Sequence, residues 1–202
     1  TPRGVRRLAT LVFAAGLAGR GYEGPITALE GRFGLLEAYC PDYDVSRLTE
    51  GLGSEFQIRR LCIKRYACHV TAQAPVEFLQ DAMRKHGFTV HDIANIELGV
   101  SDKVRSHHAN PSPSDMTGAQ YSVPYALAMA AWGAPDDPRT FEFDPADDEV
   151  RGLAEQISLR PQEGPPSKWG AEVTLRLASG TVISGTQSGF RGTPEHPFGL
   201  EE

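Results

Sequence analysis

Lysine is scarce in this chain of 202 residues, which has four lysines against sixteen arginines. Acidic residues outnumber basic residues by 26 to 20, so the net charge is −6 at pH 7. Nucleic-acid-binding domains usually present a clustered basic face, and this charge balance argues against nucleic acid as a partner. No apolar run approaches the roughly 20 residues that a membrane-spanning helix needs, so we expect no contact with a membrane.

Cysteine is also rare. Its three copies, at positions 40, 62 and 68, have no metal-ligand spacing, and we interpret them as reduced thiols of a cytoplasmic protein. The sequence has no phosphate-binding loop, no dinucleotide fingerprint, no G-x-S-x-G and no H-E-x-x-H motif. It therefore predicts no metal site and no cofactor.

The N-terminal part, residues 1–54, is predicted to be helical. Residues 4–19 are apolar on nearly every side, which is typical of a buried helix, although a basic start before an apolar run is also typical of a signal peptide. A second helix is expected at 25–38, with its proline near the first turn, and a connector at 40–54. Two helices cannot bury one another fully, so we predict that they belong to a larger helical domain.

Residues 55–190 are predicted to form an α+β domain, and residues 191–202 a tail that returns towards the helical domain. Apolar residues that alternate with polar ones predict strands, and apolar residues spaced three or four apart predict helices. The expected elements are strands at 56–63 and 94–100, a hairpin at 171–186, helices at 71–86, within 117–132 and at 144–156, and a polar loop at 101–116.

Lys64 is the most informative residue, because it stands where the first predicted strand becomes a loop. His69 follows five residues later, so an amine and an imidazole can converge on one small anion. The pKa of a lysine falls when it is desolvated, and the side chain can then act as an acid or base near neutral pH. The alternative is a solvated lysine at a strand end, because a lone Lys/His pair is weak support for a site.

Other residues could also carry chemistry. Tyr121 and Tyr125 would share one face of a helix, although buried tyrosines are common in cores. His107 and His108 lack a third ligand at suitable spacing, so we interpret them as part of a solvated loop. Arg191 in the tail could bind an anion or form part of a turn.

Several segments, taken in order, resemble the MmgE/PrpD family, which includes 2-methylcitrate dehydratase, cis-aconitate decarboxylase and iminodisuccinate epimerase. They are residues 14–18, 21–25, 29–31, 63–69, 120–128, 180 and 190–197. The resemblance implies a large helical domain and an α+β lid, with the active site between them. The chain resembles the end of the helical segment plus the lid, so we expect a second polypeptide, or another part of the same gene product, to supply the missing helical domain.

The resemblance also implies a reaction. Family members act on small polycarboxylates without a cofactor, by proton abstraction beside a carboxylate and then dehydration, decarboxylation or epimerisation. The partner is thus expected to be a small anionic carboxylic acid. The residues predicted to be catalytic are Lys64, His69 and Tyr125, and those predicted to bind substrate are Arg65, Ser122 and Tyr121.

The leading hypothesis is a lyase or isomerase that is complete only in a complex, which could also form a higher homo-oligomer. A non-catalytic lid-type subunit that supports or regulates a catalytic partner is the alternative. A small-anion binding module is a third hypothesis. A neighbouring reading frame that encodes the missing helical part, with its own histidine and acidic residues, would favour the enzyme over these two alternatives.

Overall fold

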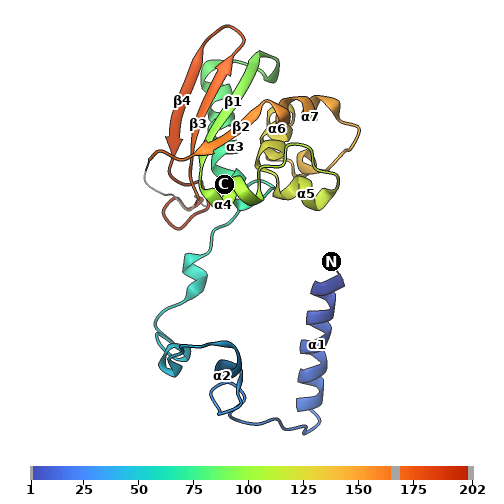
Figure 1. The fold of residues 1–202 in the computed structure, drawn as a ribbon, viewed down its shortest axis with the longest axis vertical. Helices are drawn as coiled ribbons and strands as arrows, with labels where there is room; N and C mark the ends of the chain where they lie inside the picture. Colours follow the sequence, from blue (N-terminus) through green and yellow to red (C-terminus); the bar gives the residue numbers. More distant parts are fainter. Residues whose placement is uncertain (1, 165–168, 200–202) are drawn as a thin grey trace. The chain divides into compact units, whose positions relative to one another are not determined.

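The computed structural model describes residues 2–164 and 169–199 (Figure 1). The chain forms two compact units, Thr1–Phe56 and Gln57–Glu202. The described ranges contain seven α-helices and one four-stranded mixed sheet, so the chain is α+β, as predicted. None of the described helices is both long and apolar enough to cross a membrane.

The second helix of the N-terminal unit is shorter than predicted. Helix α2 spans only Leu35–Tyr39, and most of 26–34 forms turns. The chain is tightly folded there, because a β-carbon on Gly31 would lie 2.5 Å from the carbonyl oxygen of Thr27. Glycine in a helix interior costs about 1 kcal/mol relative to alanine, and this helps to explain why the predicted helix at 25–38 is wrong over most of its length.

Helix α1 spans Pro2–Ala18, which matches the predicted helix. From residue 9 onward its apolar side chains are not buried within this unit, since Leu11, Val12 and Phe13 expose 67%, 73% and 68% of their surface. Across residues 9–56, only Gly34 is buried. These residues therefore form helices and turns without a hydrophobic core of their own.

The C-terminal unit is built on a sheet with the strand order β2-β1-β3-β4 (Figure 1). Strand β1 (Ile93–Val100) pairs in parallel with β2 (Ile157–Pro161) and antiparallel with β3 (Ala171–Leu177). Strand β4 (Val182–Gln187) completes the hairpin with β3. The predicted strand at 94–100 and the predicted hairpin are confirmed, whereas β2 was not predicted.

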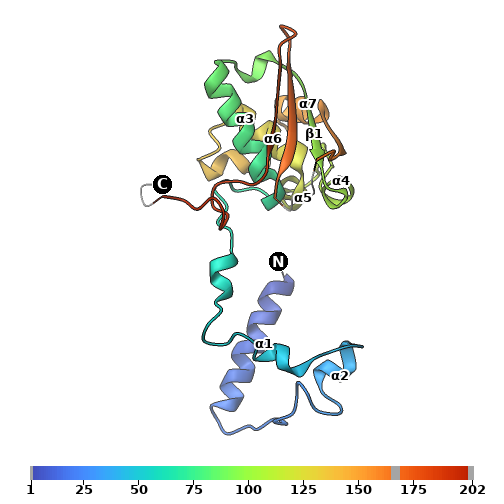
Figure 2. The same ribbon diagram turned by 90° about the vertical axis from the view of Figure 1, so that its left-hand side faces the viewer.

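Helices α3 and α6 provide most of the helical part of the core. Helix α3 (Gln73–His86) contacts β3, β4 and α6, and Figure 2 shows it lying along one side of the sheet. Helix α6 (Val123–Trp132) is buried from Val123 to Ala131, as expected for a helix that is apolar all round. The remaining helices are α4 (Asp102–His107), α5 (Met116–Tyr121) and α7 (Asp148–Glu155).

Helix α4 replaces part of the polar loop predicted at 101–116. One apolar residue, Val104, is buried against the core. Asp102 and Arg105 form an ion pair one turn apart along the helix, which is the spacing that supports short polar helices. The prediction of a loop was therefore wrong over these six residues. The helix was hard to recognise because Val104 is its single apolar residue.

The strand predicted at 56–63 is absent from the structure. Residues Gln57–Arg60 form a 3-10 helix instead. An alternating segment becomes a strand only when a neighbouring strand pairs with its backbone, and no strand pairing includes this segment in the described ranges. The alternating apolar side chains are 54–73% exposed; they are Phe56, Ile58, Leu61 and Ile63.

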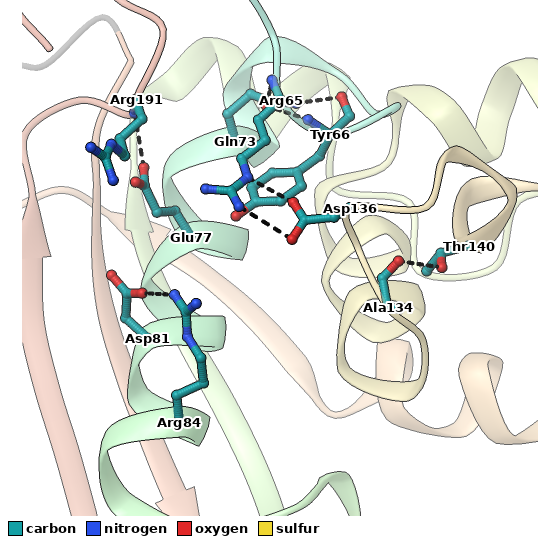
Figure 3. Close-up of polar contacts among 10 residues, drawn as sticks. All are labelled: Arg65, Tyr66, Gln73, Glu77, Asp81, Arg84, Ala134, Asp136, Thr140 and Arg191. Atoms are coloured by element: carbon teal, nitrogen blue, oxygen red, sulfur yellow. Dashed lines mark hydrogen bonds and ion pairs between the residues drawn. The ribbon is translucent and has the colours of Figure 1, made fainter. Parts of the chain in front are cut away.

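Arg191 and Gly192, in the tail, lie against the first part of the C-terminal unit. The N–H of Ile63 donates a hydrogen bond to the carbonyl oxygen of Gly192 at 2.8 Å. Gly192 has a φ of +105°, and a β-carbon there would lie 2.0 Å from the carbonyl oxygen of Ile63, so the contact requires glycine. The N–H of Arg191 donates to the buried carboxylate of Glu77 at 3.0 Å (Figure 3). A segment near the start of this unit and one near its end are therefore held together.

Candidate active site

A buried glutamine fixes the loop 64–69. Gln73, at the start of α3, is fully buried, and its Oε1 accepts hydrogen bonds from the N–H groups of Arg65 and Tyr66 at 3.0 Å each (Figure 3). Its Nε2 donates to the carbonyl oxygen of Tyr66 at 2.9 Å and to the sulfur of Cys68 at 3.3 Å. A fully satisfied buried polar network favours one conformation, so Gln73 sets the shape of this loop.

Lys64 begins the loop and His69 ends it. The ammonium group of Lys64 donates a hydrogen bond to the carbonyl oxygen of Cys68 at 2.8 Å, which folds its side chain back over the loop. The charge of Lys64 is one of the causes that lower the pKa of His69. The structure therefore places these two predicted catalytic residues at the ends of one short loop, close enough for the charge of Lys64 to act on His69.

Two further aromatic rings lie beside His69. The ring of His108, which follows α4, stacks on that of His69 with centroids 4.2 Å apart and an angle of 30° between the planes. The ring of Tyr121 lies 5.0 Å from His69 and 5.8 Å from His108. Residues from a loop and from the ends of two helices thus form one cluster, which we call the histidine cluster: His69, His108 and Tyr121.

Both histidines of the cluster are harder to protonate than usual. The pKa of His69 is lowered from 6.5 to about 4, first by burial and then by the charges of His108, Lys64 and Lys103. The pKa of His108 is also lowered, first by burial, although its hydrogen bond to the backbone of Tyr121 opposes this shift. At neutral pH both imidazoles are therefore uncharged, and the positive charge of this site comes from the lysines.

Ser122 and Tyr125 have other contacts. Ser122 is buried, and its hydroxyl caps helix α6 by accepting a hydrogen bond from the N–H of Tyr125 at 3.1 Å. The hydroxyl of Tyr125 donates to the carbonyl oxygen of Asp144 at 3.4 Å, and its ring lies 5.9 Å from that of Phe143. Tyr125, Phe143 and Asp144 line a cavity of about 330 Å³ together with Arg151. Burial is the main cause that raises the pKa of Tyr125.

Arg65 forms an ion pair with Asp136. Its Nε lies 2.7 Å from Oδ1 of that carboxylate, and its Nη2 lies 3.2 Å from Oδ2 (Figure 3). Two parallel bonds of this kind orient a guanidinium group strongly. The carboxylate of Asp136 is thus already bound to Arg65, the cation that was predicted to bind substrate.

Residues 66–202 match the profile of the MmgE/PrpD C-terminal domain. The chain belongs to the MmgE/PrpD family. This family consists of dehydratase-like and lyase-like enzymes. The matched range of this MmgE/PrpD domain includes the histidine cluster and begins two residues after Lys64. No match to the chain was found among curated proteins.

The interpretation of His107 and His108 as a solvated pair was wrong for the second of them. In this MmgE/PrpD domain His107 is exposed, but His108 exposes only 5% of its surface. Val104 and His108 are four residues apart and both are buried, so they share a face at the end of α4. The four-residue spacing from Val104 to His108 was the signal in the sequence that could have predicted the burial of His108. Within 2–164 and 169–199, no group of three or more His, Cys, Asp or Glu side chains is arranged to hold a metal ion.

Proposed function

We propose that this chain is part of an MmgE/PrpD-like lyase or isomerase acting on a small carboxylic acid. The proposed reaction is cofactor-free proton abstraction, followed by dehydration, decarboxylation or epimerisation. The observation that carries the proposal is the meeting of Lys64, His69 and Tyr121 at one loop. These are a cation, an imidazole and a phenol, which together can bind an anion and transfer protons.

The chemistry of the proposed reaction requires such a set. Removing a proton beside a carboxylate creates an enediolate-like anion, and fixed positive charge that stabilises this anion is the large energetic contribution. Lys64 would supply that charge in a chain whose net charge is −6. A positioned acid or base adds about 10²–10⁴-fold in rate, and this role falls to the histidine cluster.

The exposed apolar side chains of residues 9–56 support a second polypeptide in the complete enzyme. Contiguous apolar patches larger than a few hundred Å² are rare on soluble monomers. A partner that supplies further helices would cover Leu11, Phe13 and their neighbours. Mass spectrometry of the complex purified from its native source should show this partner, and a chain that stays monomeric and cooperatively folded at high concentration would contradict the idea.

A non-catalytic lid-type subunit is the alternative function. The observation that favours it is the engagement of both loop cations by the chain itself, because Arg65 pairs with Asp136 and Lys64 with the carbonyl oxygen of Cys68. A substrate would have to compete with these contacts. In this case the catalytic residues would all lie on the partner.

Replacing Lys64 separates the two functions. We expect Lys64→Ala to lower kcat of the assembled complex by about 10²–10³-fold on a small di- or tricarboxylic acid, the range seen when one oxyanion-stabilising group is lost. Lys85→Ala is the matched control, because this exposed lysine lies in the last turn of α3. Lys103 is unsuitable, since its charge also acts on His69. Equal activities of the two variants would favour the non-catalytic subunit.

The reaction type has its own test. If a proton is removed from carbon, turnover in deuterated water should place deuterium in the product or in recovered substrate. Lys64→Arg keeps the charge but not an amine that can titrate. Full activity of this variant would restrict Lys64 to binding the carboxylate.

A further inference from the structure

The stacked histidines differ in which ring nitrogen faces the protein. Nδ1 of His108 lies 3.0 Å from the carbonyl oxygen of Tyr121. A carbonyl oxygen can only accept a hydrogen bond, so Nδ1 of His108 must carry the proton. The Nε2 atom of a neutral His108 is therefore an acceptor.

The opposite arrangement holds at His69. The N–H of Thr71 points at Nδ1 of His69 at 3.4 Å, and the hydroxyl of Thr71 lies 2.9 Å from the same atom. A backbone N–H can only donate, so Nδ1 of His69 carries the lone pair and receives both hydrogen bonds. The proton of a neutral His69 must then lie on Nε2, which leaves a hydrogen-bond donor on that side of the ring.

The surroundings of the two rings disfavour a charge on His69. The charged or titratable groups around them are Lys64 from the loop, Lys103 and His107 from α4, and Tyr121 from α5. Apart from the phenol of Tyr121, each of these groups is cationic or can become cationic. A proton on His108 would place a positive charge at a ring only 4.2 Å from His69, and like charges at that distance repel strongly where water is partly excluded.

We propose that Thr71 fixes the proton of a neutral His69 on Nε2 and that His108 is a positioning residue, which helps to keep His69 uncharged, so that His69 presents a hydrogen-bond donor. The catalytic meaning of this arrangement rests on the proposed function. There, His69 acts as a donor to the substrate carboxylate or to a leaving hydroxyl group, and the base that removes the carbon-bound proton is a different group. The tautomer itself is a property of the folded chain and needs no substrate.

Nitrogen-15 NMR of the histidine rings in the full chain tests this proposal. In the wild-type protein at neutral pH, we expect the resonances of His69 to show the Nε2–H tautomer, with protonation only as the pH falls towards about 4. His108→Phe keeps an aromatic ring on His69 but removes the second titrating group. In this variant the pKa of His69 should rise by about one unit, while the control His86→Ala, at an exposed residue in the last turn of α3, should leave it unchanged.

Two results would overturn the proposal: a wild-type His69 with its proton on Nδ1 at neutral pH, or a His69 whose pKa is the same in His108→Phe. If the phenylalanine variant does not fold, His108→Asn replaces it, because its amide can still donate to Tyr121 but cannot be charged. If neither variant folds, the position of the proton on wild-type His69 still tests the proposal, because a proton on Nδ1 would overturn it. The expected tautomer in an assembled complex that lacks activity would refute the proposed function alone.

Discussion

Large apolar side chains are mostly exposed in residues 9–56, whereas most of those described from residue 64 onward are buried or half-buried. Phe13, Ile26 and Phe33 expose 68%, 98% and 90% of their surface, whereas Leu127 and Leu175 expose none. Both regions contain helices with apolar residues. Only the second has a sheet whose strands come from distant parts of the sequence, and this sheet gives its helices a surface to cover. Apolar content is thus sufficient for a helix but not for a core.

Truncating a large apolar side chain is expected to give the largest difference between the two units in the loss of unfolding free energy. Leu127→Ala removes a fully buried side chain of α6, and we expect it to lower the free energy of unfolding by about 2–5 kcal/mol. Phe13→Ala, on exposed α1, should change it by less than about 0.5 kcal/mol in the isolated chain. Urea denaturation followed by circular dichroism measures both. Similar losses would show that residues 9–56 have a core after all.

The next effect concerns the buried glutamine. Gln73→Ala leaves the N–H groups of Arg65 and Tyr66 without their acceptor, and such losses cost about 1–3 kcal/mol when the donor is buried. The exposed Gln120 provides the control, since Gln120→Ala should have little effect on stability. The same urea experiment, with hydrogen exchange at Tyr66, distinguishes a loosened loop from global unfolding. An unchanged exchange rate at Tyr66 would refute the role assigned to Gln73.

Stability should also depend on pH through the histidine cluster. The pKa of His69 is about 4 in the folded chain and 6.5 in the unfolded one, so between these values the unfolded state binds more protons. The free energy of unfolding should therefore fall as the pH falls from about 6.5 to about 4. His69→Asn should reduce this slope, and urea midpoints measured across that range test it. An identical slope in the variant would mean that His69 titrates normally.

The smallest effect is expected at the surface of the N-terminal unit. Arg47 and Glu50 form an ion pair at 2.8 Å, with side chains that are 74% and 63% exposed. Exposed pairs of this kind contribute about 0–1 kcal/mol, so Arg47→Ala should barely shift the urea midpoint. A loss comparable to that of Gln73→Ala would show that this unit depends on surface charge.

Elements with a regular local pattern were predicted well from the sequence. The alternation in β1 and in the β3–β4 hairpin, and the apolar spacing of α3, each occur within a single segment. Strand β2 was missed because it has only five residues and becomes a strand by pairing with β1 from much earlier in the chain. The same non-local requirement explains the failed strand at 56–63, because no strand of the described residues pairs with this segment.

The candidate site was predictable only in part for a similar reason. Lys64 and His69 are close in sequence, so their spacing alone suggested a shared site. His108 reaches His69 through the packing of α4, and a pair of neighbouring histidines in a polar segment gives little indication of that. The role of Gln73 was equally hidden, because a glutamine at the start of a helix usually faces solvent.

The contact between Ile63 and Gly192 affects how this unit can be connected to a larger protein. Its first and last segments lie side by side, joined by a backbone hydrogen bond and by a glycine that leaves no room for a side chain. A folded unit with adjacent ends can be inserted into a surface loop of another domain without stretching either one. The lid could thus be exchanged between hosts as a module, with its site residues and the cluster around them moving as one block.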